Sequence, residues 1–158
     1  MHVAVAGTFG PVHDGHRELF RTALEWGDEG VIVAVTSDAL ARGPRTRPVP
    51  SIDERMRRVR EEIEVIDEWD REVEFRSLHD EHGIASSDPD LDALVTSPET
   101  AHELADINEH RRDRGLDPIR GIIAPYVVAE DGERISSTRI VAGEIDEHGT
   151  VLDEGESV

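Results

Sequence analysis

Residues 2–20, HVAVAGTFGPVHDGHRELF, decide how the rest of this chain is interpreted. The opening HVAVA is a short apolar run typical of a buried strand, and the closing HRELF begins an amphipathic helical pattern. Gly7 and Gly15 lie in the turn between them, where glycine lets the backbone approach a ligand closely. The first N–H groups of a helix attract anions, so His13 and His16 are placed to contact one. The alternative is a solvated surface turn.

Four more β-branched runs follow this first strand. Together the expected strands cover residues 3–6, 31–36, 73–78, 91–96 and 119–126. Amphipathic helical patterns separate them, at residues 16–26, 51–66 and 97–115. This alternation predicts an α/β protein.

Capping residues predict where these helices begin and end. Ser51 and Glu54 have the spacing of a capping box, so a helix should follow Ser51. In the third helical stretch, Ser97 is the expected N-cap and Pro98 the first helical residue. Glycine provides the expected stop of that helix at Gly115.

The predicted architecture is a single domain over residues 1–158. Its core would be a doubly wound, parallel, five-stranded sheet with helices on both faces, of Rossmann-like type. In such a sheet, ligands bind beyond the carboxyl ends of the strands, where the strand order reverses. The acidic tail, residues 145–158, is expected to be flexible.

The charge of the chain limits which molecules it can bind. Asp and Glu number 36 against 17 basic residues, which gives a formal net charge of -19, and every basic residue is arginine. Nucleic acids and anionic membranes are polyanions and are therefore disfavoured as partners. Lack of lysine with excess carboxylate suggests a protein that works in concentrated salt, although a G+C-rich genome would also replace lysine by arginine. The chain has no cysteine, no apolar run of membrane-spanning length and no signal sequence, so we expect a cytoplasmic protein.

A second segment also suggests phosphate binding. RISSTRI, residues 134–140, places three hydroxyls, Ser136, Ser137 and Thr138, at the start of an expected helix, with an arginine on either side. Hydroxyls and free N–H groups there would hold phosphate. Ordinary capping by one of the two serines is the alternative. Two such segments, near the two ends of the chain, would grip one polyphosphate from both sides.

These segments resemble known signatures. GTFGPVHDGH is similar to the GTFDxxHxGH signature of the nucleotidyltransferase superfamily, and ISSTRI is similar to its second signature. AVTSD, SPET, INEHRRDRGL and AEDGERISSTRIVAGEIDEHG, which begin at residues 34, 97, 107 and 129, resemble blocks of the archaeal-type phosphopantetheine adenylyltransferases in the usual order. The resemblance covers nearly the whole chain.

The resemblance implies a reaction. ATP and 4'-phosphopantetheine would give dephospho-CoA and pyrophosphate, with Mg²⁺ carried by ATP and no dedicated metal site. By the same resemblance, Thr8, His16 and Arg139 would act on the reacting phosphates. The remaining nucleotide-binding residues that it implies are Gly7, Phe9, His13, Gly15, Arg42, Asn108, Arg111, Ser136, Ser137 and Thr138. Asn108 and Arg111 also share one helix face, so both could project into one cleft. The alternative is a surface-facing Arg111 paired with an aspartate.

Several points stay open. Arg42, Arg45 and Arg47 lie in a proline-rich loop, and the sequence does not say which of them reaches phosphate. The family usually has lysines in this loop, and it commonly has Asp where this chain has Gly10. His79, Asp80 and His82 are closely spaced, but solvated loop residues are the favoured interpretation over a metal site.

Rival functions are a sister nucleotidyltransferase acting on FMN, nicotinamide mononucleotide or glycerol 3-phosphate, and a non-catalytic nucleotide sensor. The SPET and INxxR blocks argue against the sister enzymes, and the intact histidine turn argues against the sensor. P-loop and dinucleotide-binding signatures are absent from the sequence. Oligomeric state is not predicted.

Overall fold

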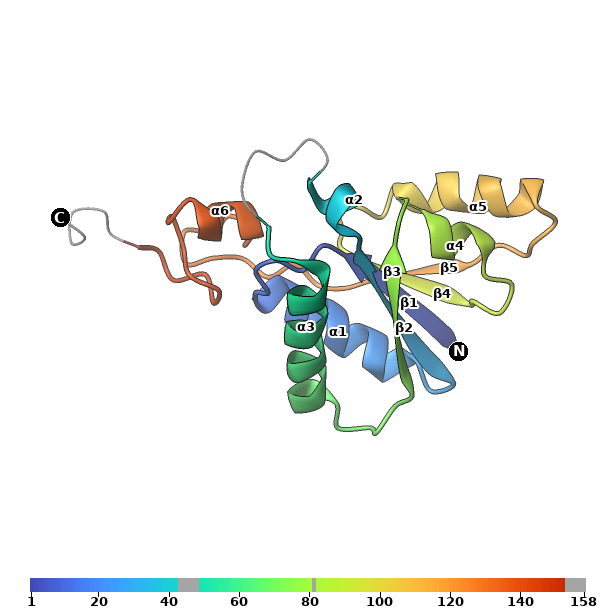
Figure 1. The fold of residues 1–158 in the computed structure, drawn as a ribbon, viewed down its shortest axis with the longest axis horizontal. Helices are drawn as coiled ribbons and strands as arrows, with labels where there is room; N and C mark the ends of the chain where they lie inside the picture. The colour runs from blue at the N-terminus through green and yellow to red at the C-terminus, as the bar shows by residue number, and fades with distance from the viewer. Residues whose placement is uncertain (43–48, 81, 153–158) are drawn as a thin grey trace.

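The fold is described from a computed structural model, in which residues 1–42, 49–80 and 82–152 are placed well enough to describe. One parallel sheet has the strand order β3-β2-β1-β4-β5 (Figure 1). The strands are β1 (His2–Gly7), β2 (Gly30–Thr36), β3 (Val73–Leu78), β4 (Ala93–Thr96) and β5 (Arg120–Ile123). The helices are α1 (Asp14–Trp26), α2 (Asp38–Arg42), α3 (Ile52–Ile66), α4 (Gly83–Ser87), α5 (Glu103–Asp113) and α6 (Ser137–Val141).

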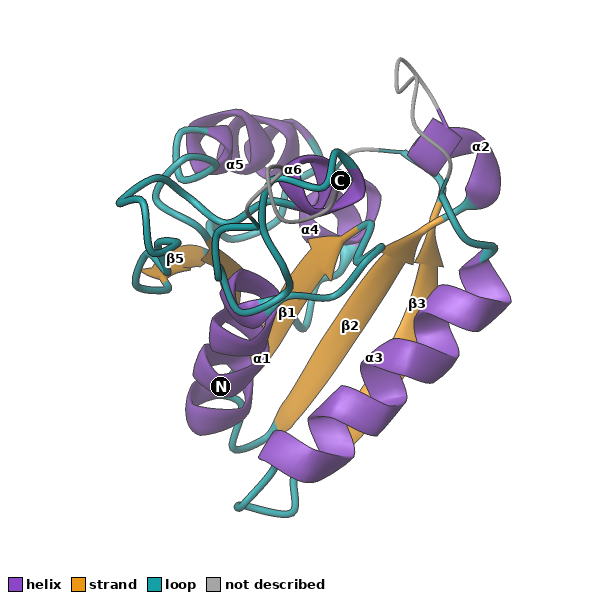
Figure 2. Cartoon of the chain, turned by 90° about the vertical axis from the view of Figure 1, so that its left-hand side faces the viewer, coloured by secondary structure: helices purple, strands orange, loops and turns teal. Residues whose placement is uncertain are grey.

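Helices cover both faces of the sheet, as the sequence predicted. Helices α1 and α3 lie on one face, and α4 and α5 lie on the other (Figures 1 and 2). Alternate residues of β1 serve the two sides: Val3 and Val5 pack in the core under α1 and α3, whereas Ala4 packs with Ile107 of α5. The doubly wound, five-stranded prediction is therefore confirmed.

The strand order reverses at β1. Chain connections run from β1 outward through β2 to β3, and then cross back to β4 on the other side of β1. The carboxyl ends of β1 and β4, which pair with each other, consequently lie side by side. This edge is where a ligand site is expected in a doubly wound sheet.

Two helix boundaries differ from the sequence prediction. Helix α1 begins at Asp14, two residues early, because the His13 side chain caps it by accepting from the Gly15 N–H. Helix α5 begins only at Glu103: the Ser97 hydroxyl pairs with the Thr100 hydroxyl at 3.1 Å instead of capping a helix. A tight turn follows, in which the Thr100 N–H donates to the Ser97 carbonyl. The Ser51 cap is confirmed, since its hydroxyl accepts from the Glu54 N–H.

The C-terminal segment returns to the start of the chain. The Ser137 hydroxyl donates to the Pro11 carbonyl at 2.7 Å, and the Asp14 N–H donates to the Glu147 carbonyl at 3.0 Å. Ile145 is fully buried in a small cluster with Ala129 and Ile135. Of the acidic tail, residues 153–158 lie outside the described residues. Within the described ranges, no helix has the length and apolar character needed to cross a membrane.

Candidate active site

Two hollows open at the edge where β1 and β4 end. The first, here called the turn pocket, measures about 200 Å³ and is lined by the histidine turn, by Ser97 and by residues 124–127. The second, the helix pocket, measures about 520 Å³ and reaches between the sheet and helices α4 and α5. Both are lined by Ala6, Gly7, Val95, Thr96 and Thr100, so the two pockets share a wall.

The two histidines of the turn are stacked, with ring centroids 3.7 Å apart. His13 Nδ1 accepts from the Gly15 N–H, and His16 Nδ1 accepts from the His13 N–H at 3.3 Å. In each neutral ring the proton is therefore on Nε2. Burial, together with the positive charges of Arg134 and Arg17, lowers the pKa of the His13 imidazole to about 4, so this ring is neutral at pH 7. His16 lines the turn pocket and can offer an N–H there.

The glycines of the turn are required by close contacts. A Cβ on Gly7 would lie 2.9 Å from the Phe9 ring, and one on Gly15 would lie 2.8 Å from His13 Cε1. Phe9 is buried with a positive φ of 53° and packs edge-on against His16, with ring centroids 5.1 Å apart. Phe9 thus packs against the His16 ring, which also stacks on His13.

A buried arginine that sequence reasoning missed supports Thr8. Arg55 of α3 is 1% exposed, and its guanidinium donates to the Thr8 carbonyl at 3.0 Å and to the Thr36 hydroxyl at 3.1 Å. The Thr36 hydroxyl in turn donates to the Thr8 hydroxyl. A Cβ on Gly10 would lie 2.9 Å from Arg55 Cδ, so the arginine stem fills the place of the usual aspartate. In sequence, Arg55 looked like one more polar residue of an amphipathic helix.

The hydroxyl segment meets the turn, but its three hydroxyls do not line the turn pocket. Ser136 caps α6 by accepting from the Arg139 N–H, Ser137 binds the Pro11 carbonyl, and Thr138 is exposed. Capping, the alternative considered for the serines, is thus observed. From the same segment, Ile135 and Arg134 do line the pocket.

The arginine that faces the turn pocket is Arg134. Its Nε lies 2.7 Å from the Glu99 carboxylate, and half of its side chain is exposed. Arg139, the residue expected from the sequence, instead pairs with Asp131 and Glu144. The sequence placed both arginines beside the hydroxyls, and only the fold distinguishes them.

Arg42 ends helix α2 with an exposed side chain and lines neither pocket. Arg45 and Arg47, the other two candidates of that loop, lie outside the described residues. The structure therefore does not select among the three.

Asn108 and Arg111 are not brought to the cleft. The Asn108 amide donates to the Ile119 carbonyl and accepts from its N–H, and it thereby holds the segment that leads into β5. Arg111 is 1% exposed and donates to the carbonyls of Asp117, Ala85 and Asp88. These partners precede β4 and β5, at the sheet edge opposite the turn. The two side chains do lie on one helix face, as expected, but they bind backbone groups of neighbouring segments.

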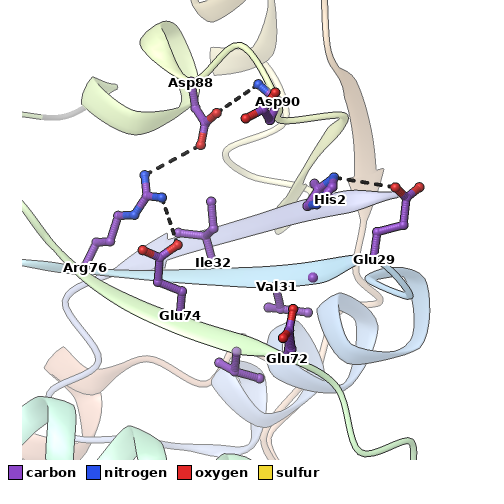
Figure 3. Close-up of a pocket in the computed structure, with 11 residues that line it drawn as sticks. His2, Glu29, Val31, Ile32, Glu72, Glu74, Arg76, Asp88 and Asp90 are labelled. Carbon is purple, nitrogen blue, oxygen red and sulfur yellow. Dashed lines mark hydrogen bonds and ion pairs between the residues drawn. The ribbon is translucent and has the colours of Figure 1, made fainter.

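A third hollow, of about 410 Å³, lies at that opposite edge. Carboxylates of Glu29, Glu72, Glu74, Asp88 and Asp90 line it beside His2 and Arg76 (Figure 3). Arg76 is paired with Glu74 at 2.8 Å and with Asp88 at 3.6 Å. So acidic a hollow would repel a phosphate, whereas the carboxyl edge offers the stacked histidines and Arg134 to a phosphorylated ligand.

Several known proteins are similar to this chain over most of its length. Residues 4–143 match the family model described as Cytidylyltransferase-like. The phosphopantetheine adenylyltransferase of Methanopyrus kandleri is 42% identical over 145 residues, which are 92% of this chain and 90% of that protein. The protein of the same name from Methanosarcina acetivorans is 37% identical over 156 residues, 98% of either chain. A crystal structure of a protein of unknown function from Archaeoglobus fulgidus aligns with a TM-score of 0.68 at 33% identity, over 79% of this chain and 90% of that one.

Proposed function

The chain belongs to the cytidylyltransferase-like family and, within it, to the phosphopantetheine adenylyltransferases, and on that premise we propose the reaction that it catalyses. The adenylyl group of ATP is transferred to the phosphate of 4'-phosphopantetheine, which gives dephospho-CoA and pyrophosphate. One observation carries the proposal: two pockets share a wall at the carboxyl ends of β1 and β4, beside the stacked histidines. Two phosphorylated substrates bound in them would meet at that wall.

The pockets differ in a way that suits the two substrates. The helix pocket is the larger, and Leu40, Leu78, Ile84, Leu94 and Ile107 make much of its lining apolar, which suits an extended pantetheine chain. Polar groups at its mouth, Thr8 among them, are placed for the substrate's phosphate. The turn pocket, with His16 and Arg134 beside the α1 N-terminus, suits ATP.

The chemistry requires positioning more than proton transfer. A phosphate monoester has a second pKa of about 6, so the acceptor oxygen is already largely ionised at neutral pH and needs no general base. Holding the two substrates in line and stabilising the charge that develops on the α-phosphate provide the catalysis. His16 is the proposed donor to that phosphate, because its Nδ1 is occupied as an acceptor and its Nε2 carries the proton.

Other groups assist in this proposal. Thr8 and the backbone of the turn hold the reacting phosphates, and Arg134 binds phosphate after leaving Glu99. The Ser136–Thr138 segment is proposed to hold the β- and γ-phosphates, since it is joined to the turn through Pro11. Mg²⁺ enters as part of the ATP substrate, because it bridges phosphate oxygens while it keeps several waters.

The charge of the chain suggests its working conditions. A net charge of -19 with arginine as the sole basic residue supports a proposed role in a salt-rich, haloarchaeal cytoplasm. At about 1 M salt the Debye length is about 3 Å, so distant carboxylates would scarcely repel an incoming phosphate. Direct contacts inside the two pockets would then provide the attraction.

A pyrophosphate-release assay tests the function. ATP or CTP is paired with phosphopantetheine, FMN, nicotinamide mononucleotide or glycerol 3-phosphate, at high and at low salt. We expect release with ATP and phosphopantetheine, and faster release at high salt. Release with another pair would identify a sister nucleotidyltransferase. Tight ATP binding without release from any pair would identify a nucleotide sensor.

A further inference from the structure

We propose that the hydroxyl of Thr96, at the carboxyl end of β4, binds the phosphate of the acceptor substrate where this phosphate meets the nucleotide. The inference rests on the proposed function and adds a substrate-contacting residue to it. Thr96 belongs to the wall shared by the turn pocket and the helix pocket. A group that passes from one substrate to the other would cross this wall.

The first observation is an unsatisfied hydroxyl. Thr96 is 6% exposed, and its Oγ1 has no hydrogen-bond partner among the residues that the structure describes. Most buried side-chain polar atoms have a partner, and leaving one unsatisfied costs stability. An unsatisfied hydroxyl beside two pockets is explained by a bound ligand that supplies the missing hydrogen-bond partner.

The neighbouring hydroxyls make Thr96 stand out. At the end of β2, Thr36 is equally buried, but its hydroxyl is held between Thr8 and Arg55. The Ser97 and Thr100 hydroxyls bind each other at 3.1 Å. Partners within the protein are therefore provided for the hydroxyls on either side, whereas none of the described residues provides one for Thr96.

The chemistry favours a phosphate as that partner. A hydroxyl donor bound to an anionic oxygen makes a charge-assisted hydrogen bond, stronger than one between neutral groups. The Thr96 carbonyl accepts from the Ala124 N–H at 2.9 Å, which fixes the backbone from which the hydroxyl extends. Because the phosphate monoester is rich in acceptor oxygens and the hydroxyl carries no charge, Thr96 can orient the nucleophile without neutralising it.

The test uses Thr96→Val, which removes the hydroxyl and keeps the branched shape, and Thr96→Ser, which keeps the hydroxyl. Calorimetry measures the affinities for phosphopantetheine and for unphosphorylated pantetheine. In T96V the preference for the phosphorylated form should fall by about 10- to 100-fold, the range expected for a hydrogen bond to a charged group. The affinity for pantetheine should not change, and T96S should retain most of the preference. The value of kcat/KM for phosphopantetheine should fall in parallel.

Thr22→Val is the matched control. Thr22 is 7% exposed on α1, and its hydroxyl donates to the Glu18 carbonyl, away from both pockets. T22V should lower the unfolding midpoint and keep the preference for phosphopantetheine, whereas T96V should keep its midpoint. An unchanged preference and unchanged kcat/KM in T96V would overturn the inference while an active parent enzyme upheld the proposed function. A parent chain that releases no pyrophosphate from ATP and phosphopantetheine would refute both.

Discussion

Arg55→Met is the substitution that most directly tests how the turn between β1 and α1, which carries Thr8, is supported. The side chain of Arg55 is 1% exposed and donates to the Pro50 carbonyl at 2.8 Å, to the Thr8 carbonyl at 3.0 Å and to the Thr36 hydroxyl at 3.1 Å. Its fourth partner is the carboxylate of Asp38, 3.2 Å away. Methionine retains much of the volume of the stem but offers no donor.

The loss of stability in R55M can be worked out from the groups that lose their hydrogen-bond donor. The Thr8 carbonyl and the buried Thr36 hydroxyl lose their donor, at about 1–3 kcal/mol each, whereas Pro50 is exposed and its carbonyl can be rehydrated. Asp38 is 39% exposed, so its carboxylate is rehydrated at little cost. We expect a loss of about 2–6 kcal/mol from these two unpaired acceptors. Since a domain has about 5–15 kcal/mol of stability in total, R55M should still fold in concentrated salt.

Urea unfolding at constant salt measures this loss. Arg57→Met on the same helix is the control, because Arg57 is 66% exposed and pairs with Glu61 on the surface. Its expected effect is about 0.5 kcal/mol. An R55M variant as stable as R57M would refute the reasoning. In that case the turn would not depend on the guanidinium.

His16→Ala should lower turnover at least about 100-fold, because the lost donor acts on charge that develops in the transition state. The affinity for ATP, measured by calorimetry, should change only a few-fold. A variant with turnover comparable to that of the parent would remove His16 from the mechanism. Lowering the pH from 7 to 4 should destabilise the protein through His13, because the pKa of this side chain falls from the ordinary 6.5 to about 4 on folding. In this pH range the unfolded chain binds a proton at His13 that the folded chain does not bind. His13→Asn, which can still cap α1, should lack roughly 3 kcal/mol of this loss in urea unfolding at the two pH values, and an identical pH profile would contradict the assignment. Arg111→Met should cost about 2–6 kcal/mol in the same assay, because the carbonyls of Ala85 and Asp88 lose their donor at about 1–3 kcal/mol each. The KM for ATP should not change, whereas a raised KM in a stable variant would restore Arg111 to the nucleotide site.

The fold could be predicted well because its signals are local. Strand and helix periods alternate, and β3 begins and ends at the expected residues. The start of α5 could not be predicted from Ser97, because serine followed by proline is typical both of a helix start and of a tight turn. The Ser97–Thr100 hydroxyl pair that favours the turn depends on the fold around it.

The site was predictable in its location and less so in its members. The histidine turn lies where the sequence pattern places it, since glycines and a helix start are local features. Arginine is different, because its long side chain reaches groups far away in sequence. Arg55 and Arg111 bind backbone, and Arg134 rather than Arg139 faces the cleft. Each of these outcomes depends on contacts that no local pattern specifies.

The bond between the Ser137 hydroxyl and the Pro11 carbonyl joins residues 126 positions apart. A second hydrogen bond, from the Asp14 N–H to the Glu147 carbonyl, joins residues that are still further apart in sequence. A polypeptide is made from its N-terminal side, so β1 and α1 are synthesised before Ser137 and Glu147. The loop between β1 and α1 therefore gains these two contacts only after the residues 126 positions further on have been added. A product that stops before Ser137 would leave this loop exposed where the folded enzyme covers it.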